Sequence, residues 1–127
     1  MEIEQNDAFC SSVTFQKSKL FAQRIVNLSL YLRREKDEKV MSNQILRSGT
    51  SIGANLAEAQ FAASKNDFVN KFHISLKECN ETLYWLDLLY DTSFLTKEQY
   101  DSMSKDCREI MKLLASSVKT AKQSLSQ

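Results

Sequence analysis

Residues 44–63 read QILRSGTSIGANLAEAQFAA and hold both glycines of the chain, Gly49 and Gly53. Apolar and small residues recur here at alternating steps of four and three, which predicts one continuous helical stripe of Ile45, Gly49, Ile52, Leu56, Ala59 and Ala63. Two interior glycines cost a helix roughly 1–2 kcal/mol relative to alanine. We therefore expect another backbone to approach this helix closely, over the small face of Gly49, Gly53 and Ala57.

The composition is that of one soluble helical domain. The chain has 127 residues, of which 43% are hydrophobic and 26% charged. It contains no proline and two glycines, and because turns between strands favour both residues, this balance predicts an all-helical chain. The net charge of +1 excludes a global electrostatic attraction for nucleic acid or membrane, so such binding would need a local patch.

Residues 1–12, MEIEQNDAFCSS, are acidic and lack an apolar core segment, so we interpret them as a tail and not as a secretory signal. No run approaches the roughly 18 apolar residues of a membrane span. The three cysteines form no CxxC pair, and their odd number argues against a disulfide framework. These features predict a cytoplasmic protein that does not bind membranes.

Helical periodicity and capping signals divide the rest of the chain, residues 13–127, into a bundle domain. Ser64 with Asp67, and Thr96 with Gln99, are typical of helix N-termini. We predict helices at about 13–37, 41–63, 65–91 and 96–124. Their short connections predict an all-α, antiparallel up-down-up-down four-helix bundle.

Counting outward from the predicted turns places residues at matching heights. Arg47 comes opposite Glu78 and Glu81, which predicts an ion pair between helices. With Ser51, Asn55 and Glu58, Arg47 also forms a polar ridge, interpreted as an interhelical network that fixes register, with a binding surface as the alternative. Cys79 and Cys107 come to nearly the same height as buried, reduced thiols, and the sequence leaves open whether they touch.

The sequence offers no set of residues suited to catalysis, metal or cofactor binding. Di-iron bundles need paired Glu-x-x-His motifs, but His73 is the only histidine and Asn70 stands three residues before it. Cys79 lies six residues from His73, on a different helix face. The two glycines lie within a helical pattern and no GK[ST] follows them, so they do not form a phosphate loop. We therefore expect a protein that is not an enzyme.

Basic residues of the first predicted helix are the only candidate nucleic-acid contact: Lys17, Arg24, Arg33 and Arg34. A solvated helix face is the alternative interpretation, and the helix macrodipole by itself accounts for Arg33 and Arg34 near the helix end.

Residues 83–90, LYWLDLLY, are apolar nearly all round the helix, more than one bundle core can use. This helix has an apolar stripe at steps of three and four that includes Val69, Cys79 and Leu86. Trp85, Leu88, Tyr84 and Ile74 fall outside that stripe, as does Leu89. Tryptophan and tyrosine are favoured interface anchors, so we expect a homo-oligomer with the first four residues in or near the subunit contact. The alternative is that the protein's own helices cover them.

The segments QILRSGTSIGANLAEA (44–59) and SKNDFVNKFHISLKECNETLYWL (64–86) resemble the bacterial four-helix bundle proteins associated with intervening sequences in 23S ribosomal RNA genes. The resemblance extends loosely from Ser18 to about Val118, although Ala59 stands where the commoner family pattern has glycine. It implies an up-down bundle and a ring-shaped homo-oligomer, with a pentamer the leading expectation, and no enzymatic activity. The ribosomal name reflects gene location in some members.

The resemblance also implies kinship with the accessory proteins of diversity-generating retroelements, which are strongly basic pentameric bundles that bind nucleic acid and a reverse transcriptase. The near-neutral charge of this chain departs from them. We therefore expect a non-enzymatic oligomeric scaffold or adaptor, and the alternative is a nucleic-acid-binding accessory protein that uses the basic residues near the N-terminus.

Overall fold

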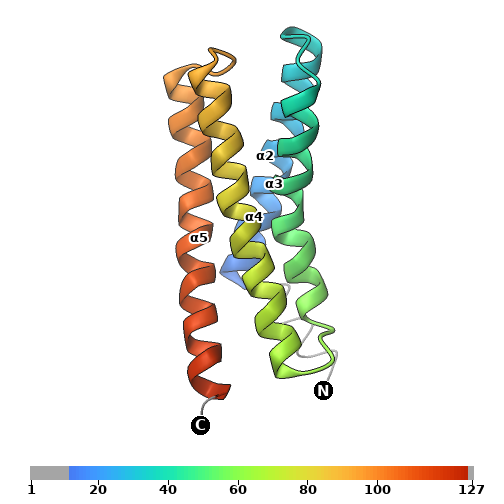
Figure 1. The fold of residues 1–127 in the computed structure, drawn as a ribbon, viewed down its shortest axis with the longest axis vertical. Helices are drawn as coiled ribbons and strands as arrows, with labels where there is room; N and C mark the ends of the chain where they lie inside the picture. Colours follow the sequence, from blue (N-terminus) through green and yellow to red (C-terminus); the bar gives the residue numbers. More distant parts are fainter. Residues whose placement is uncertain (1–11, 126–127) are drawn as a thin grey trace.

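A computed structural model describes residues 12–125 of the chain. It contains four helices, α2 (Val13–Glu35), α3 (Val40–Ala59), α4 (Lys65–Asp91) and α5 (Lys97–Leu125), joined by short turns. Successive helices run in opposite directions, so both the α2–α3 and the α4–α5 turns lie at one end (Figure 1). The part of the chain that the structure describes has no strand, and the predicted all-α up-down-up-down bundle is confirmed. The predicted tail, except Ser12, lies outside the described residues.

Side chains cap the helices where the sequence predicts. The backbone N–H of Asp67 donates to Ser64 Oγ at 3.1 Å at the start of α4. Before α5, the N–H of Gln99 donates to Thr96 Oγ1 at 3.1 Å, while the N–H of Thr96 donates to Gln99 Oε1 at 2.9 Å. This reciprocal pair is a capping box, which satisfies two backbone groups that a helix start would leave unpaired.

The predicted end of the second helix at residue 63 is wrong. Helix α3 ends at Ala59, and the chain then tightens, with the N–H of Phe61 bonded to the Glu58 carbonyl and that of Ala62 to the Ala59 carbonyl. These bonds span three residues instead of four, which closes a helix end. Ala63 therefore lies beyond the helical stripe.

Both glycines face α2, as close packing requires. A Cβ atom added to Gly49 would lie 2.7 Å from Cγ1 of Ile25, and one added to Gly53 would lie 3.1 Å from Ser18 Oγ. The predicted close approach at the glycine-bearing helix is thus confirmed, and its partner is α2. Helices α2 and α3 also meet through a buried hydroxyl pair, Ser29 Oγ and Ser42 Oγ, 2.7 Å apart.

Helix α4 packs on both α3 and α5 and therefore buries a wider face than one stripe. Leu89 is fully buried, so its placement outside the core was wrong. It continues a heptad row with Ser75 and Thr82, both fully buried. Leu30 of α2, by contrast, is 38% exposed. The core contains residues of all four helices, including Phe21, Ile52, Leu86 and Ile110.

Candidate functional site

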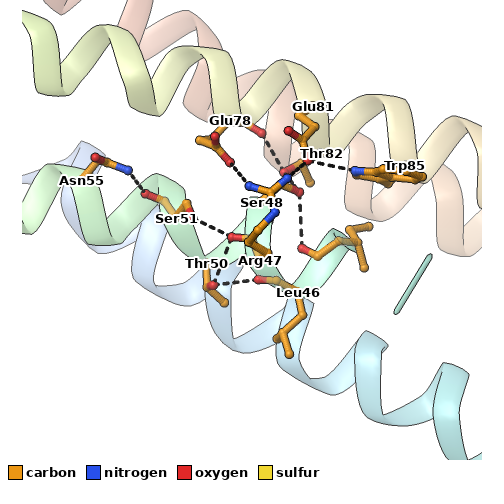
Figure 2. A network of polar contacts seen from close by, with 11 residues as sticks. Leu46, Arg47, Ser48, Thr50, Ser51, Asn55, Glu78, Glu81, Thr82 and Trp85 are labelled. Atoms are coloured by element: carbon orange, nitrogen blue, oxygen red, sulfur yellow. Dashed lines mark hydrogen bonds and ion pairs between the residues drawn. The ribbon is translucent and has the colours of Figure 1, made fainter. Parts of the chain in front are cut away.

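The structure places the predicted Arg47 ion pair between α3 and α4 (Figure 2). Arg47 Nη1 lies 3.4 Å from Glu78 Oε2, and Nη2 pairs with Glu81. The same Glu81 carboxylate accepts a hydrogen bond of 3.0 Å from Trp85 Nε1. The two glutamates and Trp85 lie on one side of α4 because they are spaced by three and four residues. One arginine therefore joins α3 to two adjacent turns of α4, and Glu81 links it to Trp85.

Beneath this ion pair lies a layer of buried hydroxyl groups. The Thr82 hydroxyl donates to Ser48 Oγ at 3.0 Å and shares its proton with the Glu78 carbonyl at 2.8 Å (Figure 2). Ser75 Oγ donates to the Ile52 carbonyl at 2.8 Å. This layer was not predicted, although the heptad spacing of Ser75 and Thr82 beside the apolar stripe is a sequence signal for it.

The electrostatics of the network follow from its partial burial. Burial raises the pKa of the Glu78 carboxyl, and repulsion from Glu81 raises it further, while Arg47 acts in the opposite direction without cancelling the rise. Asn55 and Glu58 lie further along α3. Asn55 Nδ2 donates to the Ser51 carbonyl in its own helix at 2.9 Å, and Glu58 pairs with Lys71 of α4 at 3.5 Å. The polar ridge thus ties α3 to α4 at two separate heights.

The four residues expected at a subunit contact all keep exposed surface. Tyr84 is 58% exposed, and its ring meets that of Trp85 edge-on, with centroids 5.0 Å apart. Trp85 packs against the core yet stays half-buried, as do Leu88 and Ile74. We call Ile74, Tyr84, Trp85 and Leu88 the α4 apolar face.

A second exposed apolar row, which the sequence analysis missed, lies on the outside of α2. It consists of Leu20, 60% exposed, Val26, 41% exposed, and Leu30. Leu20 and Leu30 lie on the side of α2 opposite to the buried Ile25, and Val26 lies at the flank of that side, so a helical projection of the sequence could have found them. We call these three residues the α2 aliphatic row.

The basic residues predicted to contact nucleic acid have different surroundings. Lys17 Nζ pairs with Glu109 Oε1 at 2.6 Å, and Arg24 Nη1 pairs with Asp106 Oδ2 at 2.5 Å. Arg33 Nε donates to Ser42 Oγ at 3.2 Å, whereas Arg34 is exposed near the end of α2. The first two residues therefore join α2 to α5.

Two hollows flank the Arg24–Asp106 pair between α2 and α5. One, of about 280 Å³, is lined by Arg24, Asn27, Leu28, Tyr31, Gln99 and Met103. The other, of about 160 Å³, is lined by Lys17, Leu20, Phe21, Asp106, Glu109 and Ile110. Neither contains His73, Cys79 or Cys107, and neither brings together a nucleophile and a base.

The two cysteines among the described residues lie in the hydrophobic core. Cys79 and Cys107 are both buried and free, and the Cys107 thiol donates to the Cys79 carbonyl at 3.4 Å. Contact with the Cys107 thiol, and then burial, raise the pKa of the Cys79 thiol.

Among residues 12–125, no three His, Cys, Asp or Glu side chains gather as a metal site would require. No helix in this range is both long and apolar enough to cross a membrane.

Comparison with known proteins identifies relatives of the same fold. A family model described as "23S rRNA-intervening sequence protein" matches residues 11–116. A solved structure from Bacteroides thetaiotaomicron VPI-5482, titled a protein with unknown function from the S23 ribosomal protein family, is 58% identical, with a TM-score of 0.83. The alignment covers 84% of this chain and 99% of that one. The comparison with curated proteins gives no match.

Proposed function

Because the chain belongs to the 23S rRNA-intervening sequence protein family, we propose that it is a non-enzymatic homo-oligomer that acts as a cytoplasmic scaffold or adaptor. The solved relative is of unknown function, so the relationship supplies the fold and no activity. The proposal rests on the surface of the bundle.

The α4 apolar face is the observation that carries this proposal. Tyr84 and Trp85 form an aromatic pair that keeps exposed surface, and Leu88 lies one turn further along the same side of α4. Ile74 lies on that side too, about 15 Å before Tyr84. The bond from Trp85 to Glu81 fixes the indole before any partner arrives. Aromatic anchors that are held in place lose little conformational entropy on association, which favours an interface here.

A ring needs two different surfaces on each subunit, and the α2 aliphatic row is a suitable second one. Helices α2 and α4 each pack on α3 and α5, so their outer faces point in opposite directions. Leu30 lies roughly 7.5 Å before the end of α2, and Tyr84 roughly 10.5 Å before the end of α4, at 1.5 Å per residue. Both helices end at the same end of the bundle (Figure 1). Rotation about an axis along the bundle would bring these two surfaces together at one height.

The charges beside the two surfaces are also complementary. Arg33 and Arg34 follow Leu30 on α2, whereas Asp87 and Asp91 flank the aromatic end of α4. Opposite charges at the rim of an interface guide association and fix register. Five copies remain our expected number, which comes from the resemblance to pentameric bundles.

Nucleic-acid binding through α2 is the weaker alternative. Lys17 and Arg24 already pair with carboxylates of α5, which reduces the charge they can offer to phosphate. This alternative therefore depends mainly on Arg33 and Arg34.

Light scattering of the purified chain tests the main proposal. We expect a mass that is a multiple of 14.6 kDa, and a fall toward the single-chain mass in the Tyr84→Lys variant. Phe61→Lys is the matched control, because Phe61 is 72% exposed but lies at the other end of the bundle, in the α3–α4 turn. A wild-type chain that stays single at high concentration would refute the proposal, and so would an oligomer that Tyr84→Lys leaves intact.

A further inference from the structure

The outer face of α5 carries a row of positive charge that the analysis of the sequence did not single out. Basic residues recur at steps of three and four from the middle of the helix toward its end, with Ala115 continuing the same row: Lys105, Arg108, Lys112, Lys119 and Lys122. All five basic side chains are exposed. Within residues 12–125, Lys105, Lys112 and Lys119 form no ion pair. We call Lys105, Arg108, Lys112 and Lys119 the α5 basic row.

The carboxylates of α5 nearest this row are already held in ion pairs. Asp106 and Glu109 are the last carboxylates of the sequence, and both turn toward α2, where Arg24 and Lys17 neutralise them. Asp101, nearer the start of α5, pairs with Lys97 in its own helix at 2.7 Å. The net charge of the chain is only +1, but its positive and negative side chains are unevenly distributed. From residue 110 to the end of α5, all charged side chains are lysines.

We propose that the α5 basic row binds the phosphate backbone of a nucleic-acid duplex. Lys105 and Lys119 lie fourteen residues apart, which is roughly 21 Å along a straight helix. This length covers several phosphates of one strand. The function goes beyond self-association, and it uses a different helix face from the α4 apolar face and the α2 aliphatic row.

The chemistry of the row favours a duplex over a single strand or a membrane. Single-strand binding uses exposed aromatic side chains for base stacking, and insertion into a lipid surface uses exposed apolar ones. Among the described residues, every exposed large hydrophobic side chain lies outside α5. A duplex presents only phosphates and sugars along its outer edge, and the row offers flexible cations matched to them.

Helix stability by itself does not account for the row. Arg108 and Lys112 are like charges four residues apart, a spacing that destabilises a helix. Lys119 and Lys122 lie near the end of α5, where the macrodipole favours cations, but Lys105, Arg108 and Lys112 lie in its middle. A ligand that carries phosphates would offset this repulsion.

Fluorescence anisotropy with labelled RNA and DNA duplexes of roughly two helical turns tests the proposal over a range of salt concentrations. We expect binding at low salt. Changing all four residues of the α5 basic row to Gln should weaken it at least tenfold and reduce the salt slope by about three to four. The matched control changes Lys19, Lys36, Lys39 and Lys77 to Gln, which removes the same charge elsewhere, and it should stay within about threefold of wild type.

Single-residue variants provide a second test in case the variant with four substitutions does not fold. Lys112→Gln should reduce the salt slope by about one, and Lys112→Arg should retain it. Equal losses in the row and control variants would overturn the proposal, as would a wild-type chain that binds neither duplex at low salt. Binding only to anionic vesicles, measured by co-sedimentation, would overturn it in favour of a lipid surface.

Discussion

Arg47 of α3 and Glu81 of α4 form an ion pair whose carboxylate also holds the indole of Trp85. Because the Arg47 side chain is 51% exposed, the pair contributes little free energy to folding. Its structural consequence is the fixed orientation of Trp85 on the α4 apolar face.

Glu81→Ala should therefore affect Trp85 more than stability. We expect the free energy of unfolding to fall by less than about 1 kcal/mol. The emission of Trp85, the only tryptophan, should change because its N–H loses a charged acceptor. Asp101→Ala removes an exposed pair of α5 and serves as the control, with no change in emission. Unchanged Trp85 emission in Glu81→Ala would contradict this role.

The raised pKa of Glu78 predicts a pH dependence. The folded state disfavours the ionised carboxyl, so the contribution of Glu78 to stability is present below its ordinary value of 4.5 and is lost as the pH rises through the raised pKa. Glu78→Gln stays neutral throughout. Relative to wild type, the variant should therefore gain stability between acidic and neutral pH, as measured by urea unfolding. A difference that is constant with pH would show that Glu78 titrates alike in both states.

The buried Ser48–Thr82 hydrogen bond should contribute more than the exposed ion pair. Thr82→Val keeps the shape but leaves Ser48 Oγ with only a 3.5 Å contact to the Ile45 carbonyl, which should cost about 1–3 kcal/mol. In the double variant with Ser48→Ala, we expect a loss smaller than the sum of the two single losses, by at least about 0.5 kcal/mol. Strictly additive losses in denaturant unfolding would refute the coupling.

Thr92→Val is the matched control for that cycle. The Thr92 hydroxyl is exposed and bonds to carbonyls of its own helix, at 2.7 Å for Leu88. Its loss should change stability by no more than about 0.5 kcal/mol.

Local rules predicted most of the fold and part of the network. Apolar periodicity and capping pairs such as Thr96 with Gln99 depend on neighbours in sequence, so the sequence alone predicts them. The Arg47–Glu81 pair was also predictable because both residues lie at known distances from one short turn, and a helix rises by a fixed amount per residue. No such marker stands at the end of α3, since residues 60–63 contain neither glycine nor proline.

The pairs of α2 with α5 could not be predicted in this way. Lys17 and Glu109 are 92 residues apart, and no single turn connects their helices. Whether Lys17 reaches Glu109 depends on how α2 and α5, the first and last helices, come together. Their relative position is set by the crossing angles of three successive helix contacts, and small differences in those angles add up. The basic residues of the α5 basic row are visible in the sequence. The sequence does not show that Asp106 and Glu109 turn toward α2 and pair with residues there.

The buried thiols should be unreactive in the folded protein. The thiolate is the reactive form of cysteine, and contact with Cys107 together with burial raises the pKa of Cys79. Cys10 lies outside the described residues, so a Cys10→Ser variant leaves only Cys79 and Cys107 to report. We expect a colorimetric thiol reagent to react with neither until denaturant is added, and with both thereafter. Rapid reaction of the native variant would show that the α4–α5 contact opens.

The two glycines of α3 should differ in their tolerance of alanine. At Gly49 a Cβ would lie 2.7 and 2.8 Å from Cγ1 and Cγ2 of Ile25, which is fully buried and branched at Cβ, so it has little freedom to move. Overpacking costs about 1–3 kcal/mol and exceeds the gain of about 1 kcal/mol in helix propensity. At Gly53 the nearest atom is Ser18 Oγ, at 3.1 Å, and a small rotation of that hydroxyl relieves the contact. Gly49→Ala should therefore destabilise the chain by about 1 kcal/mol or more, whereas Gly53→Ala should stay within about 0.5 kcal/mol of wild type.

Truncation of Ile25 separates the steric effect at Gly49 from other causes. Ile25→Ala removes the atoms that a Cβ at position 49 would meet, at the expense of a cavity in the α2–α3 contact. In the Ile25→Ala background, the methyl group of Gly49→Ala fills part of that cavity. Gly49→Ala should therefore raise the free energy of unfolding in this background, whereas it lowers the free energy of unfolding in the wild-type chain. If Gly49→Ala destabilises both backgrounds equally, the close contact with α2 is not the reason that this helix carries glycine there.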